Sequence, residues 1–184
     1  MANTPSNMLP LGSRAAHFEM FDTVTGKNLS LEQLKGNKGT VLFFICNHCP
    51  FVIHVNTELV RIANEYASKG ISFVAISSND VDHYPQDGPE LMKKTASYYN
   101  YPFPYLYDET QKVAKAYDAA CTPDTYLFDE NLNLVYRGQI DNSRPGNDTP
   151  VSGSDLRHAL DHLLLKKGIV ENQKPSMGCN IKWK

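Results

Sequence analysis

Residues 41–52 read VLFFICNHCPFV and join an apolar run to a pair of cysteines. The first five residues are continuously apolar, which is typical of a strand buried on both faces of a sheet. Cys46 and Cys49 follow directly, and Pro50 suits the first position of a helix. The stretch therefore predicts a buried strand, two thiols in a turn, and a helix that begins just behind them.

The residues after Pro50 extend this unit. Apolar side chains recur at helical spacing as far as Tyr66, and Gly70 is placed to end the helix. Residues 71–76 form a second, almost continuous apolar run. The order strand, helix, strand predicts one βαβ unit of an α/β domain with a parallel strand pair.

The rest of the chain continues the alternation of strands and helices. Ser30 and Ser154 are expected to cap helices. Residues 168–184 have no clear period and are expected to form an irregular C-terminal tail. The other expected elements are a hairpin at 18–21 and 27–29, helices at 89–100 and 110–117, antiparallel strands at 126–129 and 134–139, and a helix after 154.

Composition excludes several classes of function. The chain has 184 residues, 41% of them hydrophobic, and a formal net charge of −2, which suits a single domain over 1–184. Without an excess of Lys and Arg we expect no nucleic-acid partner. No apolar run approaches the roughly 20 residues that span a bilayer. We therefore expect no membrane partner and a cytoplasmic location, where the four cysteines would be thiols.

The position of the cysteine pair predicts redox chemistry. A helix N-terminus favours thiolate over thiol, and two intervening residues let one sulfur resolve a mixed disulfide formed at the other. His48 and Asn47 lie between the cysteines and are assigned to redox tuning, with His48 stabilising the thiolate. Half of a zinc site is the competing interpretation, but no second Cys-x-x-Cys or His-x-x-x-His pair is present, so we expect no metal and no cofactor.

Other polar or sulfur-containing segments have less specific expectations. Cys121 and Cys179 are expected, by default, to be buried small hydrophobes. The acidic segment 77–88, SSNDVDHYPQDG, follows a strand and is expected to be a solvated turn rather than a cation site or the rim of the active site.

A strand, a Cys-x-x-Cys, a helix and a later Thr122-Pro123 before another strand resemble the thioredoxin fold. In more detail, NHCPF, SSND, CTPDTYLFD, YRGQIDNSRPGN and GCNIKWK are similar to the peroxiredoxin-like branch of the AhpC/TSA (thiol-specific antioxidant) superfamily. The resemblance implies a central mixed β-sheet flanked by helices, with an N-terminal β-hairpin extension. It also implies a cis peptide before Pro123 that leaves a backbone group free to bind substrate. Cys121 would then lie near the pair, as a resolving or auxiliary thiol.

The sequence departs from the active-site motifs of both thioredoxins and peroxiredoxins. Ile45 stands where thioredoxins have tryptophan, so client recognition should differ. If Cys49 is aligned with the peroxidatic cysteine of peroxiredoxins, their helper proline and threonine are replaced by Leu42 and Cys46. Arg137 is then the candidate for the guanidinium of a peroxidase site, against the interpretation of a surface charge.

We therefore expect a thiol-disulfide oxidoreductase that acts on protein or small-thiol substrates, with a reductant such as thioredoxin or glutathione. Pro50 makes Cys49 the expected N-cap and favours thiolate there, whereas the thioredoxin analogy makes Cys46 the attacking thiol and Cys49 the resolving one. We follow the analogy. A thiol-dependent peroxidase is the main alternative; a redox sensor, or a copper carrier for which residues 124–151 lack a histidine, are weaker ones.

Overall fold

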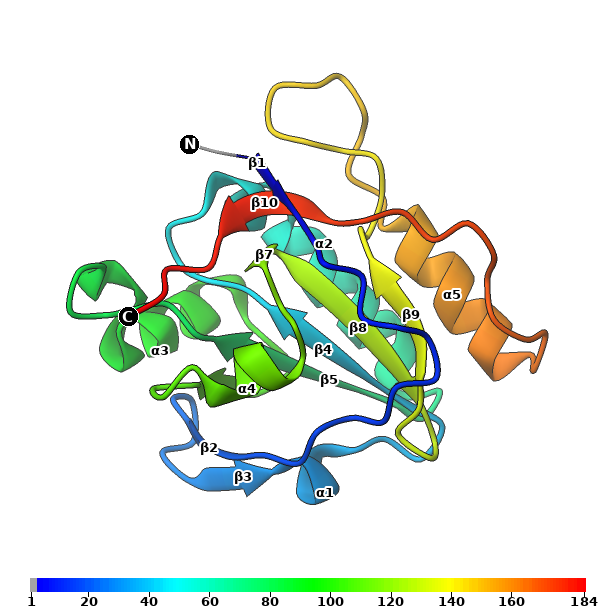
Figure 1. Cartoon of the computed structure of the whole chain (residues 1–184), viewed down its shortest axis with the longest axis horizontal. Coiled ribbons are helices and arrows are strands. Elements are labelled where there is room, and N and C mark those ends of the chain that lie inside the picture. The colour runs from blue at the N-terminus through cyan, green and yellow to red at the C-terminus, as the bar shows by residue number, and fades with distance from the viewer. Residues whose placement is uncertain (1–2) are drawn as a thin grey trace.

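The apolar run before the cysteines forms an interior strand of the main sheet. In the computed structural model, which describes residues 3–184, β4 (Gly39–Phe44) is buried along its whole length. It pairs in parallel with β5 (Ile71–Ser77) and antiparallel with β8 (Asp124–Asp129). The predicted βαβ unit is confirmed, and its first strand, β4, lies between β5 and β8 in the sheet (Figure 1).

Seven strands complete a mixed sheet in the order β3-β2-β6-β5-β4-β8-β9. The hairpin of β2 (Glu19–Asp22) and β3 (Asn28–Ser30) joins the edge through β6 (Tyr105–Tyr107). At the other edge β9 (Leu134–Gly138) pairs antiparallel with β8. The expected fold class, a central mixed sheet flanked by helices with an N-terminal hairpin, is confirmed.

Helices cover both faces of the sheet because the strand residues alternate between two cores. Val41 and Phe43 point to the core beneath α2 (Pro50–Ala67), α3 (Pro89–Tyr99) and α5 (Ser154–Leu164). Leu42 and Phe44 point to the other core, which α1 (Leu31–Leu34), α4 (Lys112–Ala116) and the N-terminal segment cover. A 3-10 turn, η1 (Pro85–Asp87), precedes α3. Among residues 3–184, no helix is long and apolar enough to cross a membrane.

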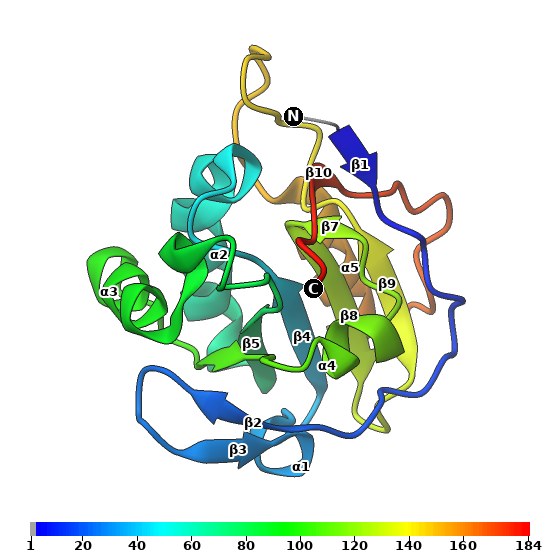
Figure 2. The ribbon, with the colours of Figure 1, turned by 60° about the vertical axis from the view of Figure 1, so that its left-hand side comes forward.

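The C-terminal tail is more ordered than expected. Within 168–184 the structure contains a strand, β10 (Met177–Asn180), between β1 (Asn3–Pro5) and β7 (Cys121–Thr122) in a second, three-stranded sheet. Both partners are distant in sequence, so their backbone hydrogen bonds leave no local pattern in the tail. Figures 1 and 2 show β10 crossing the molecule beside β7.

The helix boundaries confirm most of the expected signals. Ser30 forms a full capping box with Gln33. Gly70 has a φ of +91°, as a stop after a helix requires. The prediction for Ser154 is wrong by one residue, because Gly153 with a φ of +61° is the N-cap and its amide donates to Asp141 at 2.6 Å.

Candidate active site

The two thiols lie in the turn between β4 and α2. Cys49 is the N-cap of α2 and Pro50 is its first residue, as predicted. The amides of Val52 and Ile53 bond to the backbone oxygen of Cys49 at 3.0 Å each. Cys46 is 2% exposed and Cys49 is 0% exposed, so both sulfurs are closed off from solvent.

The loop before β8 brings a second element onto the thiols. The Thr122-Pro123 peptide is cis, as the resemblance implies. Thr122 Oγ1 lies 3.5 Å from the Sγ of Cys46, and the Cys49 thiol donates to the Thr122 carbonyl at 3.1 Å. Thr122 therefore contacts both sulfurs.

The backbone edge beside the cis proline is paired in this structure and not free as expected, while the substrate-binding role of Thr122 and Pro123 stays a prediction. β10 occupies this edge, with Cys179 opposite Thr122 and Asn180 opposite Cys121 in the antiparallel register. An extended substrate can pair here only if β10 moves.

Cys179 reaches the candidate pair, although its sequence context favours inert packing. Its Sγ lies 2.9 Å from the Sγ of Cys49, which is within hydrogen-bond distance for sulfur. Sequence reasoning noted the match of GCNIKWK to the family but gave no docking position for the tail. A lone cysteine 130 residues from its contact carries no local signal.

The contacts around Cys49 favour its thiolate. A hydrogen bond from the Cys46 thiol is the largest cause, and it lowers the pKa of Cys49 to about 5 against the opposing effect of burial. Hydrogen bonds from Cys179, Thr122 and the Val52 amide act in the same direction. The N-terminus of α2 adds its partial positive charge.

Cys46 has the opposite environment. The hydrogen bond to Cys49, burial, and the negative charge of Asp87 all raise the pKa of Cys46. Of the two thiols, Cys49 is therefore the one whose surroundings favour the thiolate, and Cys46 the one whose surroundings favour the protonated form. This division favours the N-cap interpretation over the thioredoxin analogy.

A buried carboxylate holds the turn between the cysteines. Asp87, whose side chain is 0% exposed, accepts from the Asn47 amide at 2.8 Å and contacts His48 Nδ1 at 2.7 Å. Asn79 donates to the same carboxylate at 2.8 Å, and the His48 ring stacks on Tyr84. The expectation that 77–88 is a solvated turn is therefore wrong for these residues. Carboxyl ends of adjacent parallel strands meet at one edge of a sheet, and this signal was available in the sequence.

Asn47 is also held by contacts that fix the turn. Its side chain donates to the Gln86 carbonyl at 2.8 Å and accepts from the Tyr105 hydroxyl at 3.2 Å. The assigned tuning residues Asn47 and His48 thus share one support, the loop from β5 to α3.

Two other sequence candidates lie outside the thiol cluster. The Cys121 thiol is buried, bonds to the Pro123 carbonyl at 3.6 Å, and makes no bond to Cys46 or Cys49 among the described residues. Burial raises the pKa of Cys121. The Arg137 guanidinium bonds to the Leu9 carbonyl and to Gln173, so it holds the chain segments beside β9 and supplies no charge to the thiols.

One set of side chains in this region has the geometry to hold a metal ion. Cys46, His48 and Asp87 each offer one ligand atom, and these atoms lie within 4.8 Å of one another. However, Asp87 already accepts hydrogen bonds from the Asn47 amide, the Asn79 amide group and His48. The arrangement fits a hydrogen-bonded support of the turn better than a preformed metal site.

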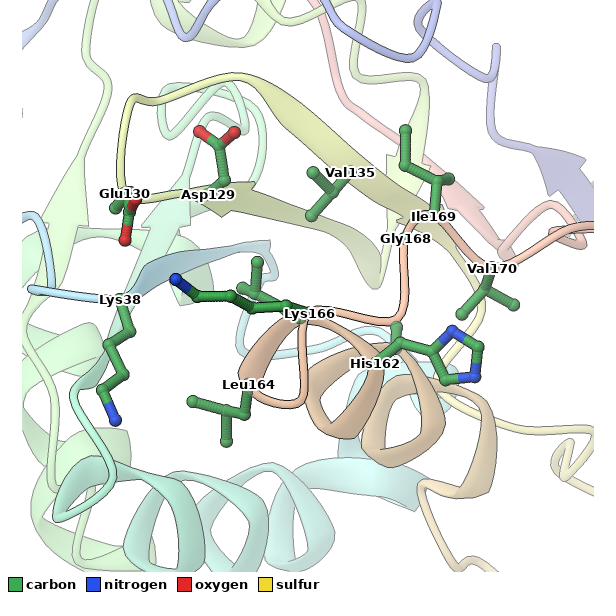
Figure 3. A pocket seen from close by; sticks show the side chains of 12 residues that line it. Lys38, Asp129, Glu130, Val135, His162, Leu164, Lys166, Gly168, Ile169 and Val170 are labelled. Carbon is green, nitrogen blue, oxygen red and sulfur yellow. The ribbon is translucent and has the colours of Figure 1, made fainter.

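A cavity lies at the end of the sheet opposite the thiols. It has a volume of about 430 Å³ and is lined by α5, the segment after it, and the turn of the β8–β9 hairpin (Figure 3). Lys38 and Asp129 on its wall flank Gly39 at the start of β4, whereas the thiols follow the end of β4. The cavity is therefore remote from the cysteines.

Comparisons with known proteins agree with this geometry. The chain is 27% identical over 125 residues to the thiol-disulfide oxidoreductase ResA of Halalkalibacterium halodurans, and the match covers 67% of this chain and 65% of that protein. An uncharacterized conserved protein from Geobacillus kaustophilus is 59% identical, with a TM-score of 0.98 over 100% of this chain and 97% of that one.

The fold is shared more widely. The thioredoxin domain of a thiol-disulfide oxidoreductase from Bacteroides vulgatus superimposes with a TM-score of 0.65 at 19% identity, over 85% of this chain and 99% of that one. The family model for AhpC/TSA matches residues 11–137, which include β4, the CNHC turn, the cis proline and β8. The chain is therefore a thioredoxin-fold member of the AhpC/TSA family.

Proposed function

We propose that this protein is a thiol-disulfide oxidoreductase in which Cys46 and Cys49 form the redox pair. The observation that carries the proposal is the environment of Cys49, whose sulfur lies at the N-terminus of α2 among hydrogen-bonding side chains of Cys46, Cys179 and Thr122 that lower its pKa. The name of the ResA relative, a thiol-disulfide oxidoreductase, is consistent with it.

In the proposed mechanism, the Cys49 thiolate attacks a substrate disulfide and forms a mixed disulfide, with the first substrate thiolate as the leaving group. The Cys46 thiol then loses its proton to the second leaving thiolate and attacks the Cys49 sulfur. A Cys46–Cys49 disulfide results, and the substrate gains two electrons. This order reverses the one suggested by the thioredoxin analogy, because the surroundings of Cys46 favour its protonated form.

His48 and Asp87 support this step as positioning residues. Asp87 fixes the Asn47 amide and the His48 ring, so the turn keeps both sulfurs beside Thr122. The imidazole is partly exposed, with 25% of its side chain accessible, and it lies between the buried carboxylate and solvent. We propose that it relays the proton of Cys46 to the second leaving thiolate during resolution.

The partners follow from the chemistry. The oxidised pair must be reduced by another thiol, for which thioredoxin or glutathione is the proposed donor, and the substrate is a protein or low-molecular-weight disulfide. Because β10 covers the cis-proline edge, we propose that substrates enter when this strand is displaced.

A thiol-dependent peroxidase is the second candidate. The lowered pKa of Cys49 and the membership of the AhpC/TSA family favour it. The contacts of Arg137 weigh against it, because the guanidinium bonds to Leu9 and Gln173 and gives the thiols no donor for a bound peroxide.

Stopped-flow kinetics separate the two candidates. The fully reduced protein and its Cys46→Ser and Cys49→Ser variants are mixed with oxidised glutathione or with hydrogen peroxide. We expect oxidised glutathione to react through Cys49, and peroxide to react no faster than with a small thiol of similar pKa. A peroxide reaction that is faster by orders of magnitude would identify a peroxidase on the same fold.

A further inference from the structure

The sulfur of Cys49 has two thiol neighbours, and only one of them belongs to the CNHC turn. Cys46 hydrogen-bonds to it from the same turn, and Cys179 contacts it at 2.9 Å from the C-terminal strand. Resolution of a mixed disulfide needs only a thiol within reach of the attacked sulfur. Both neighbours meet this requirement.

The strand that carries Cys179 is fixed closely against the cis-proline loop. A side chain at Gly178 would place its Cβ 2.0 Å from the Thr122 carbonyl oxygen, so only glycine allows this approach. The next residue, Cys179, pairs with Thr122 in the register of β10 and β7. Because residue 178 is glycine, β10 packs close enough to the cis-proline loop for the Cys179 sulfur to contact Cys49.

The tail is also held beyond the strand. The Lys182 amide donates to Asn79 at 2.8 Å, and the Asp80 amide donates to the Lys182 carbonyl at 2.8 Å. Asn79 also donates to Asp87, the carboxylate under the CNHC turn. The tail and the turn are therefore anchored on the same loop, so that Cys179 lies beside Cys49 whenever β10 is seated against β7.

We propose that Cys179 is a second resolving thiol, and that a Cys49–Cys179 disulfide forms in the reaction cycle alongside Cys46–Cys49. This inference rests on the proposed oxidoreductase function. It gives β10 the role of a tethered strand that occupies the substrate edge and presents its own sulfur there.

The step balances without a further reactant. A substrate disulfide RSSR and the Cys49 thiolate give the Cys49–SR mixed disulfide and one RS⁻. The Cys179 thiol loses its proton, its sulfur bonds to the Cys49 sulfur, and the Cys49–SR bond breaks. The second RS⁻ takes up the proton. Two cysteines are thereby oxidised and the substrate is reduced by two electrons.

The two products differ in their effect on the tail. A Cys49–Cys179 disulfide ties β10 covalently to the N-terminus of α2, over the cis-proline edge. A Cys46–Cys49 disulfide leaves β10 held by noncovalent contacts alone, and the edge can open when the strand is displaced. The choice of resolving thiol therefore sets whether the oxidised protein is closed or accessible.

Trapping with glutathione tests the inference in a background without Cys46. Cys46→Ser, Cys46→Ser/Cys179→Ser and the matched control Cys46→Ser/Cys121→Ser are reduced and mixed with one equivalent of oxidised glutathione. Acid-quenched samples are then analysed by intact mass and by peptide mapping. In Cys46→Ser and in the control we expect bound glutathione to be lost as a Cys49–Cys179 disulfide appears. In Cys46→Ser/Cys179→Ser we expect its release to be about 10²-fold slower.

The outcomes separate the two proposals. If glutathione stays on Cys49 equally long in all three variants, Cys179 is not a resolving thiol, while the oxidoreductase proposal stands. If Cys49 takes up no glutathione in any variant, both proposals fail. Cys179→Ala and Gly178→Ala in the same background provide independent checks, because the first removes the sulfur and the second displaces it. Both should slow the release of glutathione.

Discussion

The two ends of β4 differ in kind. Past its C-terminal end lie the sulfur of Cys49 with the two cysteine sulfurs that contact it, a cis proline and a fully buried aspartate. Before its N-terminal end lies the 430 Å³ cavity, lined by side chains such as Leu163 and Ile169 with lysines at its rim. The 430 Å³ cavity and the cysteine thiols thus lie at opposite ends of the same sheet.

The difference shows why cavity size is a poor guide to this site. Buried polar groups are costly unless they are hydrogen-bonded, and the thiol end concentrates them around sulfur. The charged groups at the cavity end lie at the rim, where they stay hydrated and the cost of desolvation is small. A site that works on disulfides needs positioned sulfur and a stabilised negative charge, and it requires little preformed volume.

Removal of the central sulfur should have the largest effect. We expect Cys49→Ser to slow the reaction with oxidised glutathione by at least about 10³-fold, because the attacking thiolate is lost. Leu163→Ala, at the cavity end, should leave this rate within about threefold of the parent while it lowers stability. Equal losses in the two variants would mean that the two ends are not functionally distinct.

A buried carboxyl at the thiol end should make stability depend on pH. Burial raises the pKa of Asp124 to about 7, from an ordinary value of 3.8. A raised folded-state pKa gives stability that is complete below pH 4 and is lost as the pH rises through 7. Relative to Asp124→Asn, the parent should lose on the order of 2–4 kcal/mol of unfolding free energy between pH 4 and pH 8. Urea titrations at several pH values measure this, and parallel curves would refute it.

The thiolate of Cys49 should make the site reactive in acid. With its pKa lowered to about 5, the thiolate is present above pH 5 and is lost below it. We expect alkylation of Cys49 by iodoacetamide to fall only about tenfold from pH 7 to pH 4, whereas glutathione, the reference thiol, should fall about 10³-fold. A fall as steep as that of glutathione would remove the electrostatic basis of the site.

Asp87 should have a smaller and more specific effect. Its negative charge contributes to the raised pKa of Cys46. In a Cys49→Ser background, Asp87→Asn should therefore increase alkylation of Cys46 at pH 7 by about threefold. Asp80→Asn is the matched control, since Asp80 lies in the same loop but pairs with the exposed His83. An equal increase in both variants would show that the effect is not specific to the carboxylate under the turn.

The parts of the site that the sequence predicted are those with local signals. The apolar run to Ile45 indicated the buried strand, Pro50 indicated that Cys49 caps α2, and Thr122-Pro123 indicated the cis peptide. Each signal depends on a few adjacent residues, whose conformations are set by local sterics and capping.

The parts that were missed depend on contacts distant in sequence. Cys179 meets Cys49 across 130 residues, and β10 forms only because β1 and β7 supply its hydrogen-bond partners. The buried carboxylate of Asp87 accepts hydrogen bonds from the Asn47 amide and Asn79 and contacts His48. The composition of segment 77–88 alone does not predict these contacts. The proposed order of attack depends on both, since Asp87 and the hydrogen-bonded sulfurs shift the pKa values of the two thiols in opposite directions.

A redox titration of the unmodified protein tests the central claim most directly. The protein is equilibrated at pH 7 in buffers of increasing oxidised-to-reduced glutathione ratio, quenched with acid, alkylated and mapped by mass spectrometry. We expect a two-electron transition whose product is an intramolecular disulfide that contains Cys49. If all four cysteines stay open to alkylation at every ratio, the CNHC pair is not a redox couple and the proposed function is wrong.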